Sequence, residues 1–159
     1  MPIWLTLLTQ FSILAFAVLG GVFLAFSDFL MRSLKKTGGR TGMEAMLSIN
    51  REVFRYVFIP LFLAMVPVSI MLAVSASIIL PKPHLFIGAA LIYLLGAFAV
   101  TMFGNVPMNN RLEALRSETE EGLTYWEDRY LSVWTLYNSI RTAACILASG
   151  VLLFAMTSY

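Results

Sequence analysis

Four long apolar stretches limit how this chain can fold. The hydrocarbon core of a bilayer is crossed by about 20 apolar residues of helix. Stretches of that kind occupy about residues 3–27, 56–80, 85–104 and 136–157. Because every backbone polar group must be satisfied inside lipid, each stretch is expected to be a helix. The sequence therefore predicts an all-α integral membrane four-helix bundle, as a single domain over residues 1–159.

The composition agrees with a membrane location. Charged residues make up 13% of the chain and hydrophobic residues 59%, whereas a soluble domain carries about 25% charged residues. The net charge of +2 is too small for a nucleic-acid-binding surface. We therefore expect the lipid bilayer as a partner and no nucleic acid, and leave open whether identical chains associate. The uncharged stretch from Pro2 to Ser27 is expected to remain as a span, because a signal peptide has a basic start and a shorter apolar core.

Cysteine and histidine are each present once. Cys145 lies in an apolar stretch, and His84 lies between a proline and a span. Neither residue can build a metal site of the His- and Cys-rich kind alone. We expect no disulfide, no metal and no cofactor, although a site made of carboxylates alone stays open.

The basic residues predict the orientation of the bundle. Positive charge gathers in cytoplasmic loops. Nine of the 11 lysines and arginines lie in the first and third loops: Arg32, Lys35, Lys36, Arg40, Arg51, Arg55, Arg111, Arg116 and Arg129. The short second loop has only Lys82. This distribution predicts that both long loops are cytoplasmic and both termini outside, in the cell (inner) membrane.

Both long loops are expected to contain short amphipathic helices. Thr41 to Glu44 has the pattern of a capping box. Apolar residues then follow at helical spacing, so a helix from Met43 is expected to continue into the second span. In the third loop we expect a helix over Met108–Arg116, an acidic bend, and a second helix from near Thr124 that merges with the fourth span.

Polar residues from three spans are expected at one depth. Counting about 20 residues inward from the outer side places Asp28, Asn105 and Arg141 at the same level. Ionisable residues inside a membrane usually face the bundle interior and a partner. We therefore predict that Asp28 and Arg141 are in contact, directly or through one asparagine. The alternative is that Arg141 reaches the lipid headgroups with its long side chain.

One face of the fourth helix is aromatic and polar. Trp126, Tyr130, Trp134, Asn138 and Arg141 recur at steps of four, four, four and three residues, so they share a helical face. With Asn105 and Asn109 from the third helix, this face suits a planar hydrophobic small molecule, either polyketide- or quinone-like. For the aromatic residues alone, an ordinary interfacial belt is the favoured alternative. The asparagines are as well explained by hydrogen bonds between helices.

A block of residues in the second half of the chain resembles a known family. Its members are small four-helix membrane proteins similar to anthrone oxygenases, and the shared residues are Asn105 to Leu112, Trp126, Tyr130, Trp134-Thr135, Asn138 and Arg141-Thr142. Weaker agreement in the first half covers Gly20-Gly21, Phe26-Ser27, Met31, Leu34, Met46, Ile49-Asn50 and Phe54. Many relatives have proline where this chain has Arg32.

The resemblance implies a reaction. Fungal members are similar to enzymes that oxidise an anthrone to an anthraquinone with dioxygen, whereas most bacterial members have no assigned function. On this basis Asp28 is the expected base, or the group that orients Arg141. Arg141, Asn105 and Asn138 are the expected donors to the developing phenolate oxygen, and no metal is needed. Because fold does not transfer activity, a non-catalytic binder, carrier or support subunit of a membrane complex stays the alternative.

Overall fold

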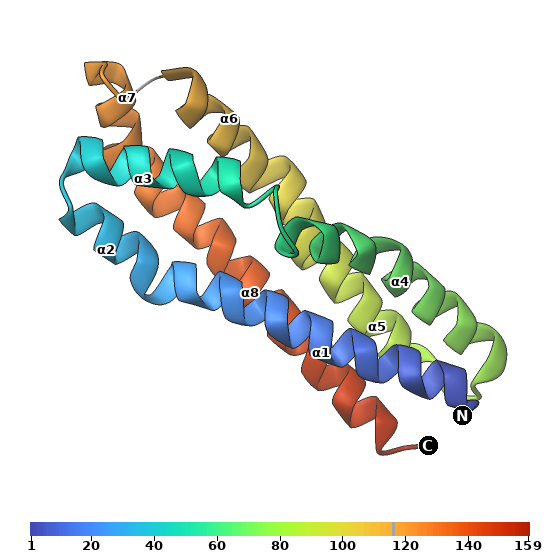
Figure 1. Ribbon diagram of the computed structural model, residues 1–159. Coiled ribbons are helices and arrows are strands. Elements are labelled where there is room, and N and C mark those ends of the chain that lie inside the picture. Colours follow the sequence, from blue (N-terminus) through green and yellow to red (C-terminus); the bar gives the residue numbers. More distant parts are fainter. Residues whose placement is uncertain (116) are drawn as a thin grey trace.

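The computed structural model describes residues 1–115 and 117–159, and these form helices joined by short turns (Figure 1). Some helices contain π-helical segments, in which the backbone is wider than in an α-helix; they are labelled η. The first two spans and their connection contain α1 (Ile3–Ala25), η1 (Phe26–Leu30), α2 (Met31–Lys36), α3 (Gly39–Glu52) and α4 (Phe58–Ile79). The last two spans contain α5 (His84–Tyr93), η2 (Leu94–Ala99), η3 (Thr101–Asn105), α6 (Val106–Leu115), α7 (Glu120–Tyr125), η4 (Trp126–Trp134) and α8 (Thr135–Met156).

Four continuous helices of the described residues are long and apolar enough to cross a membrane. They extend over Ile3–Lys36, Phe58–Ile79, His84–Leu115 and Glu120–Met156. Large apolar side chains point outward, as Leu14 (67% exposed) and Ile78 (77% exposed) show, while polar Thr9 and Asn138 are fully buried. A bundle whose surface is apolar and whose interior is partly polar suits lipid as the solvent. The predicted all-α membrane bundle is confirmed.

The bundle has two different ends. Figure 1 shows both termini and the turn between α4 and α5 at one end, here called the terminal end. Helices α2, α3 and α7 and the end of α6 gather at the other, here called the loop end. A core around Phe16, Leu72 and Leu152 fills the terminal half, and is called the apolar core. A second core around Met43 and Trp126 fills the loop end, and is called the loop-end core.

Helix α3 differs from its prediction at both ends. It begins at Gly39, after Gly38 with φ of 92°, and no side chain caps it, so the predicted capping box is wrong. It ends at Glu52, and residues 53–57 turn before α4 begins. The predicted continuation into the second span is therefore also wrong. Pro60 gives the reason, because its ring would clash with the carbonyl of Tyr56 inside a continuous helix but fits the first turn of a new one.

The third loop is shorter than predicted. The third span runs unbroken to Leu115, so no separate helix begins at Met108, and Arg116 lies outside the described residues. The fourth helix begins at Glu120 instead of near Thr124, with the Thr119 hydroxyl accepting a bond from the Gly122 amide at 3.1 Å. Of the acidic residues expected in a bend, Glu118 lies in the turn before this helix, as predicted. Glu120 and Glu121 instead open the helix, where the positive end of its dipole favours them.

Candidate functional site

A cavity of about 100 Å³ lies where the apolar core meets the loop-end core. Its polar lining residues are Asn50, Thr101, Asn105, Asn109, Asn138 and Arg141. Its apolar lining residues are Val22, Phe23, Phe26, Met46, Ile49, Val53, Phe54, Phe58, Ile59, Val106 and Trp134. Five of the eight predicted site residues therefore line one cavity, and these are Asn105, Asn109, Trp134, Asn138 and Arg141.

Irregular backbone surrounds this cavity. Of the four π-helical segments in the described part of the chain, η1, η3 and η4 each supply lining residues. Segment η3 precedes Pro107, which has no N–H to bond the carbonyl four residues earlier. The Val106 amide bonds instead to Thr101, five residues back. Such π-helical turns are frequent at functional sites, because they shift the side chains that follow.

Arg141 is the charged group of the cavity. Its side chain is buried, with 6% exposure for the residue. Its Nη2 donates to Asn138 Oδ1 at 2.6 Å and its Nη1 to Thr101 Oγ1 at 3.3 Å. The guanidinium carbon lies 4.2 Å from the ring centre of Phe23 and 5.3 Å from that of Trp134. Arg141 therefore points inward, and the alternative that it reaches the headgroups is wrong.

Asp28 is not the partner of Arg141. It lies on η1 with its side chain exposed, and the ion pairs of the described residues are Arg51–Glu113 and Arg55–Glu52. The expected asparagine relay does exist, but Asn138 Nδ2 donates to Ser27 Oγ at 2.7 Å and to the Phe23 carbonyl at 2.5 Å. The predicted contact is wrong by one residue, because helical depth alone does not say which face a side chain occupies.

Asn105 ties the third helix to the fourth. Its Nδ2 donates to the Trp134 carbonyl at 3.2 Å, at the point where η4 ends and α8 begins. Asn138 Nδ2 likewise donates to the Phe23 carbonyl, near the start of η1. Both amides therefore cover backbone carbonyls beside π-helical segments. Two buried atoms of the cavity residues have no hydrogen-bond partner among the described residues: Asn105 Oδ1 and Arg141 Nε.

Asn109 fixes the aromatic residues of the fourth helix. Its Oδ1 accepts from Tyr130 OH at 2.7 Å and from Trp134 Nε1 at 2.8 Å. The Tyr130 hydroxyl also accepts from Asn50 Nδ2 at 3.4 Å, which joins α3 to the same network. One amide oxygen therefore sets the positions of two rings.

The aromatic residues form a stack. Ring centres are 5.4 Å apart for Trp126 and Tyr130 and 5.9 Å apart for Tyr130 and Trp134, with the planes within 27° and 20° of parallel. All three are buried, so the alternative of a lipid-facing belt is wrong. Only Trp134 lines the cavity, however, while Trp126 and Tyr130 lie in the loop-end core.

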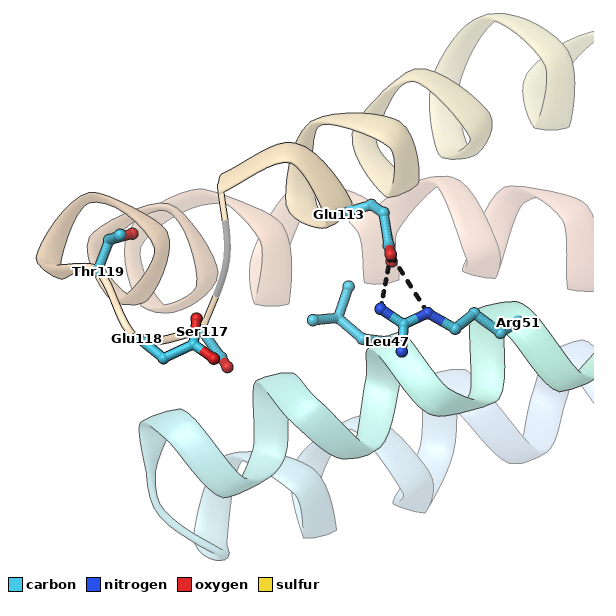
Figure 2. Close-up of a pocket in the computed structure, with 6 residues that line it drawn as sticks. All are labelled: Leu47, Arg51, Glu113, Ser117, Glu118 and Thr119. Atoms are coloured by element: carbon cyan, nitrogen blue, oxygen red, sulfur yellow. Dashed lines mark hydrogen bonds and ion pairs between the residues drawn. The ribbon is translucent and has the colours of Figure 1, made fainter.

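Helix α3 and the turn after it close one side of the cavity. Met46, Ile49 and Asn50 belong to α3, and Val53 and Phe54 follow it. Figure 2 shows the outer side of this helix, where Arg51 reaches across a shallow pocket to Glu113 on α6, with an N–O distance of 2.6 Å. Ser117 Oγ also donates to Glu44 of α3 at 3.0 Å. Polar contacts at the surface therefore hold α3 in place.

The sequence reasoning missed several lining residues. Phe23 read as an ordinary span residue, and only the weaker family resemblance of the first half marked Phe26. Thr101 carried a signal, since it lies one turn before Asn105 on the same helix. No three His, Cys, Asp or Glu side chains of the described residues are grouped so that they could hold a metal ion.

Fold and cavity together define a small integral membrane protein of four long helices, with a buried arginine and four asparagines between two cores. The family model described as anthrone oxygenase matches residues 51–151, which is more than half of the chain. The chain belongs to the anthrone oxygenase family. No curated protein and no solved structure matches it.

The matched region contains most of the polar cavity. Asn105, Asn109, Asn138 and Arg141 lie inside it, as do Trp134 and Thr101. The wall formed by α1, η1 and most of α3 lies outside the match. The family resemblance therefore covers the polar groups more fully than the wall that faces them.

Proposed function

We propose that the cavity binds a planar, largely apolar small molecule, polyketide- or quinone-like, and that the protein oxidises an anthrone there with dioxygen. The observation that carries the proposal is the buried guanidinium of Arg141 beside the rings of Phe23 and Trp134. Rings suit a flat ligand, and a few fixed polar groups orient it. Family membership supports the reaction class.

The proposed chemistry needs donors at a developing oxyanion. An anthrone loses a proton from the carbon between its rings, and the negative charge spreads onto its carbonyl oxygen. Arg141 stabilises that oxygen by charge and hydrogen bonding, an effect that is large in a site without water. The carbanion then adds dioxygen to form a hydroperoxide, which loses water. One anthrone and one dioxygen thus give one anthraquinone and one water.

The proposed base, Asp28, is not among the residues that line the cavity. Asp28 stays the predicted base, and it follows Ser27, which accepts a bond from Asn138 of the cavity. No carboxylate is among the described residues that line the cavity. Stabilisation of the anion by Arg141 therefore carries more of the proposed rate enhancement than the base does.

Entry of a three-ring molecule requires movement. The cavity holds about 100 Å³, whereas pockets for such ligands hold about 300 Å³ or more. The turn after α3 is the proposed moving part, because Phe54 is 67% exposed and yet lines the cavity. Val22 of α1 is also exposed at the rim. We propose that the ligand enters from the lipid side, between α1 and the start of α4.

The loop end is proposed to face the cytoplasm. Eight basic residues of the described part lie on α2, α3, α6, η4 and the turn after α3, towards this end, whereas Lys82 lies in the turn between α4 and α5 at the terminal end. The rule that positive charge stays inside favours this orientation in the inner membrane. Reporter fusions at both termini test it, and activity of a cytoplasmic reporter fused after Tyr159 would contradict it.

The reaction is tested with purified protein in lipid nanodiscs. Anthrone oxidation is followed by absorbance, with dioxygen uptake measured in parallel and no metal added. The wild type should exceed the spontaneous rate, and Arg141→Ala should remove about 100-fold of that gain. Asp28→Asn tests the base, and Arg32→Ala is the control, because Arg32 is exposed on α2. A gain abolished by a chelator would show a metal-dependent reaction.

The alternative function is non-catalytic. A carrier or binder of hydrophobic metabolites, or a support subunit, needs a cavity but no base, and the lack of a carboxylate among the described lining residues fits that requirement. Tight binding of an anthrone without any gain in its oxidation rate would favour the carrier. The absence of both binding and oxidation would favour the support subunit.

A further inference from the structure

We infer that the ligand of this cavity carries an oxyanion on a flat aromatic body, as a phenolate or a carboxylate, and that this group is the counter-ion of Arg141. The inference rests on the proposed function for the cavity as a binding site. It goes further by naming the charge that the ligand brings, before any reaction begins.

The charge of Arg141 has no carboxylate partner among the described residues. Both ion pairs of the described residues involve other arginines, Arg51 and Arg55. The hydrogen-bond acceptors of Arg141 are a neutral amide and a neutral hydroxyl, on Asn138 and Thr101. A cation that is buried without an anion is costly inside a membrane. A bound anion removes that cost, and a neutral ligand does not.

One edge of the guanidinium remains available for that anion. Nη1 and Nη2 each donate to the protein, while the buried Nε has no partner among the described residues. Arginine is a planar donor that matches carboxylate and phenolate oxygens well. The free donor and the missing counter-ion are separate observations, and both point to an oxyanion.

The surroundings favour an aromatic anion. Phe23 and Trp134 lie against the guanidinium at 4.2 and 5.3 Å, and Phe26 contacts Trp134 at 5.7 Å between ring centres. Asn105 Oδ1 is a buried acceptor without a partner among the described residues. A ligand hydroxyl next to the oxyanion can donate to this Asn105 oxygen. A hydroxylated aromatic acid or a molecule with two phenols has such a hydroxyl.

An anionic lipid headgroup shares the oxyanion chemistry and is the competing source. The rim residues Val22 and Phe54 are exposed on the side of the bundle that faces lipid. Against this source, the lining beside Arg141 is aromatic, which suits a flat ring system better than a headgroup with its glycerol. The test therefore includes an anionic lipid as a separate arm.

The experiment compares two probes of nearly the same shape, one anionic and one neutral. Anthracene-2-carboxylate and anthracene-2-carboxamide are titrated with the protein in phosphatidylcholine nanodiscs, and binding is read from the fluorescence anisotropy of the anthracene. We expect the carboxylate to bind at least about tenfold more tightly. Arg141→Gln should abolish the preference, and Arg32→Gln, at an exposed arginine, should retain it. Arg141→Lys keeps the positive charge and should retain part of the carboxylate preference. This variant keeps the test decisive if Arg141→Gln folds poorly.

Each outcome decides one point. Equal affinity for the two probes would overturn the inference, as would a carboxylate preference that persists in a folded Arg141→Gln protein. Displacement of the carboxylate by nanodiscs containing phosphatidylglycerol would assign the anion to lipid and overturn the aromatic ligand. Accelerated oxidation of an uncharged anthrone without any carboxylate preference would overturn this inference but leave the proposed reaction standing. Carboxylate preference without oxidation would leave the inference standing and remove the proposed reaction.

Discussion

The two cores of this bundle use their buried polar groups in opposite ways. In the terminal half, the hydroxyls of Thr9, Ser12 and Ser69 each bond to the carbonyl four residues earlier in their own helix. Near the loop end, the amide groups of Asn105, Asn109 and Asn138 bond to a different helix. Tyr93, which donates to the Phe62 carbonyl, is an exception in the terminal half.

This difference shows where the fold depends on exact partners. In the terminal half, Thr9, Ser12 and Ser69 are satisfied within their own helices. The helices there pack by shape, as where Gly20 lies against Cys145. The helices near the loop end satisfy one another's groups, so losing one side chain leaves another buried and unpaired. The cavity lies where the hydrogen bonds between helices begin.

The largest effect is expected from Asn109→Leu. This change removes the acceptor of both Tyr130 OH and Trp134 Nε1, which become buried donors without a partner. A loss of about 3 kcal/mol in the free energy of unfolding is expected, measured by chemical unfolding in detergent with tryptophan fluorescence. Asn110→Leu is the matched control, because Asn110 is exposed and adjacent. Equal losses in both variants would contradict the role of the amide.

Gly42→Ala should loosen the loop end next. A Cβ at this position would collide with the Leu34 carbonyl oxygen and lie 3.3 Å from the Trp126 ring. Backbone cannot rearrange as cheaply as a side chain, so a loss of about 2 kcal/mol is expected. Faster amide hydrogen exchange in α2 and α3 would locate the effect. Gly21→Ala, where a Cβ meets nothing within 4 Å, should cause no loss.

Gly96→Ala tests packing by shape in the terminal half. Its Cβ would lie 2.6 Å from the Cβ of Ala144. The better helix propensity of alanine offsets part of the clash, so the expected loss is about 1 kcal/mol. Ala144→Gly in the same chain should relieve the clash, and a double-mutant cycle measures the coupling. Additive losses in the double variant would contradict the direct contact.

The smallest effect is expected from Arg51→Gln. The ion pair with Glu113 joins α3 to α6, but both side chains are about half exposed or more, at 64% and 48%. Exposed pairs contribute about 0–1 kcal/mol and weaken with salt. A small loss of stability that disappears at high salt is therefore expected. A loss of several kcal/mol, unchanged by salt, would show that this pair is a main support of α3.

The same comparison explains how far the sequence could predict the structure. Apolar length and period predicted the four spans, because burial in lipid depends on composition more than on individual partners. The depth of Arg141 and the shared face of Trp126, Tyr130 and Trp134 also followed from helical geometry. Such geometry predicted which residues are neighbours along one helix.

What the sequence did not predict depends on rotation between helices. Asp28 and Arg141 share a depth, yet the relay from Asn138 ends on Ser27. A π-helical segment rotates every side chain that follows it, and Phe26–Leu30 forms such a segment around Asp28. Trp126 and Tyr130 were expected in the pocket wall, but they belong to the loop-end core because α2 and α3 pack around them. These positions are properties of several helices together.

Photo-crosslinking tests the central claim, a ligand-binding cavity around Arg141, most directly. Anthraquinone-2-carboxylate, whose excited carbonyl abstracts nearby hydrogen atoms, is illuminated with the protein in nanodiscs, and the modified peptides are mapped by mass spectrometry. The account predicts labels on the cavity residues Val22, Met46, Ile49 and Val106, and their loss in Arg141→Gln but not in Arg32→Gln. Labels confined to outward-facing residues such as Leu14 and Ile78, and unchanged in Arg141→Gln, would contradict it.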